Sequence, residues 1–288
     1  MHLPTFYLMG FLPSFAEVKL IPFFPLKQNS LDKFFSFRQY LRYLLVAKGP
    51  DSIHSPFVFD FYNAVLTHPY RFYSHEILEE KRTEILNDLT VIEFEDPGAV
   101  KKFRQDKIGN LASRSLMPVE KAVLLFQLSH WLRPEKVLEL GTSFGLTTAY
   151  LAKAYPSEIT TFEGVSPIAE RARALWESLD IFSIDSRTGK VEEMLPDFLQ
   201  DPENHPDLAI VDADHRFEAT IRNFQLLANV AKDGTCIVFD DIYWSVGMGK
   251  AWETIKADSR VTVSIDVFGF GIVFFRKASK KENFVLRW

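Results

Sequence analysis

The fold of this chain is decided by the stretch Val137-Leu138-Glu139-Leu140-Gly141-Thr142-Ser143-Phe144-Gly145. An apolar strand runs into an acidic residue and two glycines, and a helical pattern over 146–155 follows. Glycine is favoured where the chain turns sharply and a ligand approaches the backbone without a Cβ in the way. The helix start then offers backbone N–H groups to an anionic group of that ligand. The stretch therefore predicts a loop that binds a nucleotide-like cofactor.

A second strand, expected over 159–163, ends in Glu163, whose carboxylate is suited to accept hydrogen bonds from ribose hydroxyls. The dinucleotide fingerprint requires G-x-G-x-x-G, whereas this loop has G-x-x-x-G with Ser143 at the place of the middle glycine. The spacing disfavours a nicotinamide dinucleotide. For the loop alone, an ordinary strand-to-helix turn without a ligand remains the alternative.

Near-continuous apolar strands recur along the chain, and each is followed by a helical pattern. They are expected at 136–140, 159–163, 208–212 and 235–240, as in a parallel sheet buried on both faces. The pattern then alternates over 261–267, and a glycine-bearing turn leads to a last strand at 272–275. We predict an α/β fold with a Rossmann-like, mostly parallel sheet that ends in an antiparallel C-terminal hairpin.

Composition is that of an ordinary globular chain, with 288 residues of which 47% are hydrophobic and 25% charged. The net charge of −5 gives no general attraction to nucleic acid, so nucleic acid is not an expected partner. The single cysteine, Cys236, rules out an internal disulfide and lies in an apolar run. We expect it to be buried, and a cytoplasmic location follows as the default.

Three regions are expected along the chain: an apolar arm over 1–29, a helical lobe over 30–115 as a candidate substrate cap, and the α/β domain over 116–288. Four prolines, together with Glu17 and Lys19, interrupt the apolar residues of the arm. Neither a signal peptide nor a transmembrane segment is therefore expected there.

Acidic residues follow two expected strands at their carboxyl ends, where open α/β sheets bind ligands. Strand 208–212 ends at Asp212, with His215 three residues later, and strand 235–240 ends in Asp240-Asp241. Three carboxylates at adjacent strand ends are hard oxygen ligands of the kind that Mg²⁺ and Mn²⁺ prefer. The alternative is structural, with Asp212 bonded to a cofactor or a helix start and Asp240-Asp241 capping a helix near Val246.

Taken in order, these residues resemble the class I S-adenosylmethionine (SAM) dependent methyltransferases over roughly 117–277. The loop is similar to the E-x-G-x-x-x-G motif of catechol and caffeoyl-CoA O-methyltransferases, and Val211-Asp212-Ala213-Asp214 to the V-D-A-D of the latter. His215 and Asp241 depart from that branch, which has lysine and asparagine there. Both residues match the macrocin O-methyltransferase branch, which is sugar-directed and metal-dependent.

The resemblance implies a role for each of these residues. The methionine end of SAM would lie at Glu139 and Gly141, the ribose at Glu163, and the adenine at Gly189 and Lys190. The expected cofactor-binding residues are Glu139, Gly141, Thr142, Ser143, Gly145, Glu163, Gly189, Lys190 and Asp212. Asp212, Asp240 and Asp241 would bind Mg²⁺ or Mn²⁺.

His215 is the expected general base, because a neutral histidine accepts a proton near pH 7. We also expect a side chain introduced at Gly145 to face the cofactor and block its binding.

Three functions remain open on the sequence alone. The first is SAM-dependent, divalent-metal-assisted O-methylation of a small hydroxylated molecule, such as a catechol or a vicinal diol. The second is a metal-independent SAM methyltransferase that acts on oxygen, nitrogen or carbon. The third is a non-catalytic SAM-fold binding module that acts through its N-terminal lobe. The expected partner is a small-molecule methyl acceptor, and a homo-oligomer is compatible with the chain.

Overall fold

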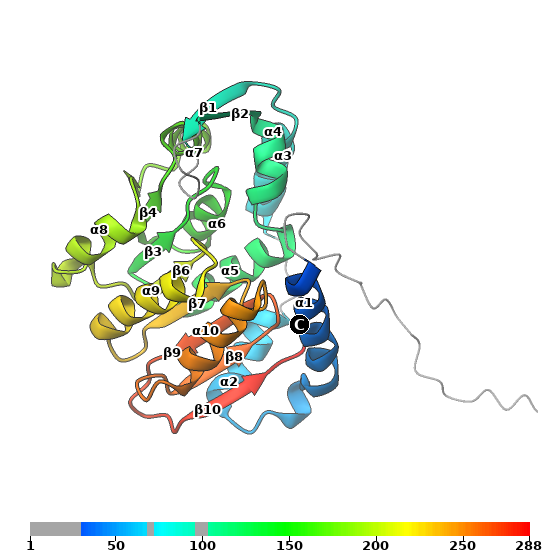
Figure 1. The fold of residues 1–288 in the computed structure, drawn as a ribbon. Helices are drawn as coiled ribbons and strands as arrows, with labels where there is room; N and C mark the ends of the chain where they lie inside the picture. Colours follow the sequence, from blue (N-terminus) through cyan, green and yellow to red (C-terminus); the bar gives the residue numbers. More distant parts are fainter. Residues whose placement is uncertain (1–29, 68–71, 96–102) are drawn as a thin grey trace, which may run out of the picture.

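A computed structural model describes residues 30–67, 72–95 and 103–288, so the predicted arm at 1–29 lies outside the described residues. An eight-stranded sheet runs through the molecule, and helices cover both of its faces (Figure 1). Within the described ranges, no helix is long and apolar enough to cross a membrane.

The central sheet has the strand order β10-β8-β9-β7-β6-β3-β4-β5. Its parallel part consists of β3 (Lys136–Leu140), β4 (Glu158–Glu163), β5 (Ile184–Thr188), β6 (Leu208–Val211) and β7 (Cys236–Asp240). Strand β9 (Phe270–Phe274) runs antiparallel to both β7 and β8 (Val263–Asp266), which confirms the predicted hairpin. Strand β10 (Glu282–Val285) pairs in parallel with β8 at the edge.

Alternate strand residues face two different helical layers. Helices α5 (Val119–Leu132), α6 (Leu146–Ala154) and α7 (Ser166–Ser178) cover one face, and α8 (Val191–Phe198), α9 (Phe217–Val230) and α10 (Val246–Ala257) cover the other (Figure 1). On β3, Val137 packs in the core that contains α5, whereas Leu138 packs in the core that contains α8, α9 and α10. Burial on both faces explains why these strands are apolar throughout.

Residues 30–115 are mostly helical, as predicted, but they also contain an antiparallel hairpin that the sequence did not predict. The elements are α1 (Ser30–Val46), η1 (Pro50–Ser52), α2 (Pro56–Phe61), η2 (Tyr62–Leu66), α3 (Tyr73–Leu86), β1 (Val91–Glu95), β2 (Phe103–Lys107) and α4 (Ile108–Ser115). Val58 and Phe61 of α2 share a core with Phe270 and Phe274 of the sheet. This part of the chain therefore contributes to the main core.

Several helix boundaries have plain chemical causes. Pro56 and Pro167 lie in the first turns of α2 and α7, where the N–H that proline lacks has no partner within the helix. Ser245 caps α10, because its Oγ accepts the N–H of Met248 at 3.1 Å. A short 3-10 turn, η3 (Pro202–Asn204), precedes β6.

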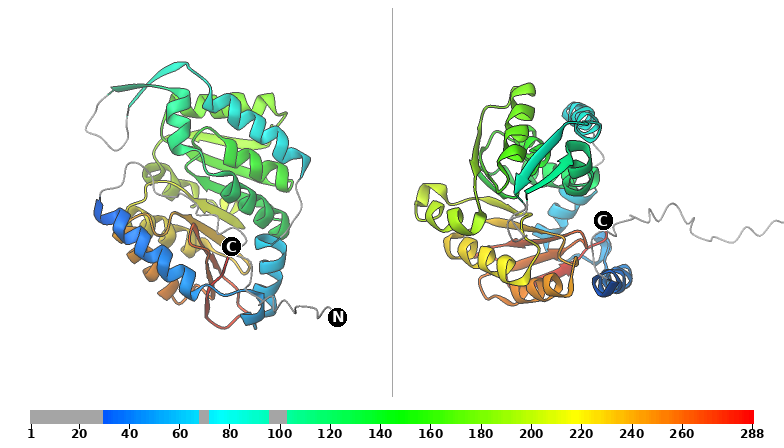
Figure 2. Two further views of the ribbon diagram at one scale, coloured as in Figure 1. Left: turned by 90° about the vertical axis from the view of Figure 1, so that its right-hand side faces the viewer. Right: turned by 45° about the horizontal axis from the view of Figure 1, so that its top comes forward.

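Helix α1 lies along α10 beside the C-terminal strands (Figure 2). The hydroxyl of Ser36 donates to the carbonyl of Tyr243 at 2.6 Å, and the hydroxyl of Tyr43 donates to the carbonyl of Leu286 at 2.7 Å. Lys48 forms a parallel bridge with Leu286 directly after the helix. Residues 30–48 are thus held by residues from the opposite end of the described chain.

Candidate functional site

Gly141 lies where the carboxyl ends of β3 and β6 come closest. Its φ is +103°, and a Cβ at this position would lie 2.4 Å from the carbonyl oxygen of Asp212. Two backbone segments in contact cannot move apart without separating the strands. Glycine is required here for a left-handed turn and for this close backbone approach.

Gly145 has a φ of +77° and begins α6, but its missing side chain does not face an open site. A Cβ would lie 2.7 Å from the Cβ of Ala172 and 2.8 Å from the ring of Trp176. The indole N–H of Trp176 also donates to the carbonyl of Gly145 at 2.8 Å. The prediction that a side chain at Gly145 would face the cofactor is therefore wrong, because that space is filled by α7.

Glu163 connects the end of β4 to the glycine loop, by which we mean residues 141–145. Its Oε2 accepts the N–H of Ser143 at 2.8 Å, and its Oε1 accepts the N–H of Val165 at 2.9 Å. Burial raises the pKa of Glu163, and the backbone hydrogen bonds act against this rise. The two halves of the predicted cofactor pattern are therefore in direct contact.

Glu139 is buried beneath the glycine loop. Its Oε2 accepts the hydroxyl of Thr148 at 2.5 Å and the hydroxyl of Thr161 at 2.7 Å. Burial raises the pKa of Glu139 to about 7, and these two hydrogen bonds lower it only in part. The carboxyl group thus ties β3 to β4 and α6.

We expect Glu139→Gln to change how stability depends on pH. The pKa of Glu139 in the folded protein is raised from 4.5 to about 7. Its contribution to the free energy of unfolding is therefore fully present below pH 4.5 and is lost as pH rises through 7. Glutamine can still accept the two hydroxyls but does not ionise. Urea unfolding should show that the free energy of unfolding of the variant rises relative to that of the native protein between pH 5 and 8, by on the order of 2 to 3 kcal/mol. Parallel pH profiles of the two proteins would contradict the assignment.

Thr142 and Ser143 use their side chains within the protein. The hydroxyl of Thr142 is buried and lies 2.6 Å from that of Thr161, while the hydroxyl of Ser143 donates to Ser115 at 3.0 Å. The backbone N–H groups of Gly141 and Thr142 donate to the carbonyl of Phe162 at 3.0 and 3.2 Å. These bonds hold the glycine loop against the end of β4.

The predicted adenine residues lie at the end of β5. Gly189 has a φ of +152° and donates its N–H to the carbonyl of Glu163 at 2.8 Å, so this turn is next to the predicted ribose residue. Lys190 is exposed, and its ammonium lies 3.3 Å from the carboxylate of Glu193. The two residues are therefore brought together with the glycine loop by the order of the strands.

Asp212, Asp240 and Asp241, which we call the acid cluster, lie at the adjacent ends of β6 and β7. Lys121, which the sequence did not predict as a site residue, completes this cluster. The ammonium of Lys121, from the first turn of α5, lies 2.5 Å from Oδ1 of Asp240 and 2.6 Å from Oδ1 of Asp241. Burial lowers the pKa of Lys121, but the two carboxylates outweigh burial and raise it above its ordinary value.

Two carboxyl groups of the cluster, those of Asp212 and Asp240, hold protons more tightly than usual. Burial raises the pKa of Asp212 well above its ordinary value, and the charges of Asp240 and Asp241 add to this rise. Burial also raises the pKa of Asp240, while the charge of Asp241 adds to the rise and Lys121 lowers it in part. The single positive charge of Lys121 therefore offsets only part of the negative charge that three ionised carboxylates would carry.

His215 lies beside the acid cluster, as predicted from its spacing. Its Nε2 is 3.6 Å from Oδ1 of Asp212, and its ring centroid is 5.7 Å from that of Trp244. Its side chain is 27% exposed, against 5% for Lys121. Among these groups, His215 is thus open to a ligand at the carboxyl edge of the sheet.

The predicted metal site does not fit this arrangement. Mg²⁺ requires oxygen ligands at about 2.0 to 2.1 Å in a near-octahedral set. An ammonium instead occupies the space between Asp240 and Asp241. Within 30–67, 72–95 and 103–288, no group of three or more His, Cys, Asp or Glu side chains is arranged to hold a metal ion. The capping alternative also fails for Asp240 and Asp241, since Ser245 caps α10.

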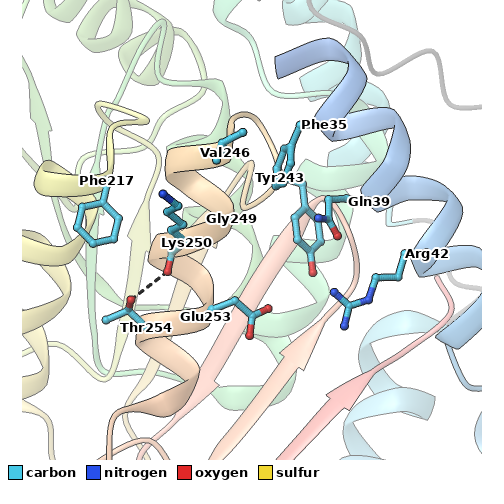
Figure 3. A pocket seen from close by; sticks show the side chains of 10 residues that line it. All are labelled: Phe35, Gln39, Arg42, Phe217, Tyr243, Val246, Gly249, Lys250, Glu253 and Thr254. Atoms are coloured by element: carbon cyan, nitrogen blue, oxygen red, sulfur yellow. Dashed lines mark hydrogen bonds between the residues drawn. The ribbon is translucent and has the colours of Figure 1, made fainter. Parts of the chain in front are cut away.

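A groove of about 640 Å³ lies between α1 and α10, away from the glycine loop (Figure 3). Phe35, Gln39 and Arg42 line it from α1, and Glu253 faces them from α10. A second cavity, of about 530 Å³, lies between β5 and α8. Neither cavity is lined by a predicted cofactor residue, so these two cavities do not define the cofactor site.

Comparison with known proteins gives a family for the central part of the chain. Residues 138–242 match a protein family described as a methyltransferase domain. This segment spans the glycine loop, Glu163 and the acid cluster. No curated protein sequence matches the chain.

Solved structures of O-methyltransferases share the fold. A putative O-methyltransferase from Klebsiella pneumoniae is 16% identical with a TM-score of 0.52, covering 74% of this chain and 94% of its own. The Bacillus cereus O-methyltransferase in complex with SAH is 17% identical with a TM-score of 0.52, covering 73% and 94%. TomG from Streptomyces achromogenes, an O-methyltransferase of tomaymycin synthesis solved with SAM, is 16% identical with a TM-score of 0.52, covering 86% and 100%.

The domain match and the shared fold agree with the identification made from the sequence. Residues 138–242 match a methyltransferase domain, and the sheet that carries them has the fold of these solved O-methyltransferases.

Proposed function

We propose that this chain is a class I SAM-dependent methyltransferase that transfers a methyl group from SAM to a hydroxyl oxygen of a small molecule. The observation that carries the proposal is the contact between Glu163 and Ser143, which joins the glycine loop to an acidic strand end at the same edge of the sheet as the acid cluster. The O-methyltransferases that share the fold support oxygen as the acceptor atom.

The cofactor would lie across the carboxyl ends of β3, β4 and β5. Glu163 binds the ribose hydroxyls, and the turn at Gly189 and Lys190 lies against the adenine. The methionine end lies against the glycine loop, in which the hydroxyls of Thr142 and Ser143 are bonded within the protein. The remaining residues assigned to the cofactor are Glu139, Gly141, Gly145 and Asp212.

The reaction is a direct SN2 displacement in which the acceptor oxygen attacks the methyl carbon of the sulfonium. The oxygen–carbon bond forms as the carbon–sulfur bond breaks, and the thioether leaves as S-adenosylhomocysteine (SAH). Placing donor and acceptor in line contributes on the order of 7 to 11 kcal/mol. His215 takes the proton of the acceptor hydroxyl, and the net negative charge of the acid cluster beside it stabilises the histidinium that forms.

Assistance by Mg²⁺ or Mn²⁺, which the resemblance implies, is assigned no step. The ammonium between Asp240 and Asp241 leaves these carboxylates unsuited to bind a divalent cation. The chain's own groups account for orientation and proton removal.

We expect Glu163→Ala to weaken SAM binding by about 1 to 3 kcal/mol, which is about 5- to 150-fold in Kd. The physical reason is the loss of the acceptor for the ribose hydroxyls and of the bond that fixes the N–H of Ser143. Titration calorimetry with SAM measures the change. Glu158→Ala, at the opposite and exposed end of the same strand, is the matched control and should bind as the native protein does. Equal affinities for all three proteins would contradict the role of Glu163.

Calorimetry of the native protein with SAM and SAH tests the proposed function. We expect both to bind with one-to-one stoichiometry, and methyl transfer from labelled SAM to appear with hydroxylated small molecules. Absence of binding would overturn the proposal and favour the non-catalytic binding module. Binding with transfer only to amine acceptors would overturn the assignment to oxygen.

A further inference from the structure

Lys121 is a buried charged residue whose stem packs against apolar groups and whose ammonium contacts the acid cluster. Its side chain is 5% exposed, and its ammonium lies 5.0 Å from the centroid of the Phe270 ring. Its aliphatic stem passes over Gly269, where a Cβ would lie 2.8 Å from Cε of Lys121. A larger residue at 269 would displace the stem. The position of the ammonium is therefore fixed by the packing around it.

The ammonium lies where a divalent cation would have to bind. It is within 2.6 Å of one oxygen from each of Asp240 and Asp241, and it interacts electrostatically with Asp212. A pair of buried carboxylates without a counter-charge is unfavourable, so a cation stabilises this cluster. Here the protein supplies that cation from α5.

We propose that Lys121 is the resident cation of the acid cluster, so that methyl transfer uses no divalent metal and the cluster binds one only when Lys121 is removed. The part of this proposal that concerns methyl transfer rests on the proposed function. The part that concerns cation binding does not. Lys121 acts as a positioning residue, because it orients Asp240 and Asp241 rather than the reacting atoms.

The class of methyl acceptor follows from the presence of an ammonium where a divalent cation would bind. A divalent cation selects acceptors that present two adjacent oxygens, such as a catechol. An ammonium already bonded to two carboxylates imposes no such requirement, and His215 needs only one hydroxyl. The acceptor class is therefore a small molecule with a single hydroxyl at the site of methylation, with no vicinal partner needed.

Binding of Mn²⁺ without any other ligand tests the proposal. Electron paramagnetic resonance of the native protein in millimolar Mn²⁺ should show no stoichiometric bound ion. Lys121→Met keeps the length of the stem but removes the charge, and we expect at least about tenfold tighter Mn²⁺ binding than in the native protein. Adding Asp240→Asn to that variant should abolish the gain. Lys153→Met is the matched control, since its ammonium donates to the carbonyl of Leu179 at 3.1 Å rather than to a carboxylate of the acid cluster, and it should gain no Mn²⁺ site.

Two results would overturn the proposal. One is stoichiometric Mn²⁺ binding by the native protein that Asp240→Asn removes, and the other is a folded Lys121→Met variant that gains no Mn²⁺ binding. Circular dichroism and thermal unfolding establish that the variants fold. If Lys121→Met does not fold, Lys121→Gln is used in its place. Mn²⁺ binding to the native protein tests the first of the two results without any Lys121 variant.

Turnover of the native enzyme with EDTA completes the test. We expect the rate to be unchanged after exhaustive chelation, and a loss that Mn²⁺ restores would overturn metal independence. Failure to bind SAM would refute the proposed function instead, and would leave the Mn²⁺ measurements as a separate result.

Discussion

We expect His215→Ala to lower kcat by about 10²- to 10⁴-fold, the usual range for loss of a general base, while SAM affinity stays nearly unchanged. The reason is its position at the open edge of the acid cluster, 3.6 Å from Asp212 and apart from the glycine loop. Single-turnover rates with saturating SAM measure the chemical step, and calorimetry measures SAM affinity.

His205→Ala is the matched control for this experiment. The ring of His205 is half-buried like that of His215, but it contacts the carbonyl of Leu199 at 3.2 Å and lies away from the acid cluster. Its removal should leave kcat near the native value. A native rate in His215→Ala, or an equal loss in both variants, would show that another group accepts the proton.

The second large effect is expected at Gly145, where valine should lower the free energy of unfolding by about 2 to 5 kcal/mol. Two costs add: an L-residue at a φ of +77°, and overlap with Ala172 and Trp176 at 2.7 to 2.8 Å. Because the glycine loop moves when α6 shifts from α7, SAM binding should weaken as an indirect result. Urea unfolding followed by tryptophan fluorescence measures the stability.

Gly234→Val separates the two costs. Gly234 has a φ of +93°, but nothing lies within 4 Å of the place where its Cβ would be. Its replacement should cost only the backbone strain, about 1 to 2 kcal/mol. If both variants lose the same stability, the contact with Trp176 contributes nothing.

Most of the fold could be predicted from residues close together in the sequence. The apolar runs and the alternation after residue 261 predicted the strands, because burial on one or two faces leaves a direct pattern. Strand β5 was missed since Ile184–Thr188 reads as polar apart from its first residue, as suits a strand at the edge. The hairpin of β1 and β2 was missed because half of its residues are charged and no continuous apolar run marks its strands.

The site was predictable only in part. The strand ends brought Asp212, His215, Asp240 and Asp241 together because sequence order determines which ends are adjacent. Lys121 comes from a helix far upstream, and no pairing rule connects it with β7. One signal was available, since Lys121 is a lone charge on the buried face of an apolar helix. A buried lysine needs an acidic partner, and three unpaired aspartates were candidates.

The pairing of α1 with the far end of the chain has a consequence for biosynthesis. The hydrogen bonds from Ser36 to Tyr243 and from Tyr43 to Leu286 join residues 207 and 243 positions apart. A ribosome synthesises roughly 5 to 20 residues per second, so α1 exists for on the order of ten seconds before these partners emerge. During that time Leu31, Phe34 and Leu45, which stay exposed even in the folded protein, add to the apolar surface of the uncovered helix. The nascent chain therefore presents α1 to chaperones long before the methyltransferase sheet can hold it.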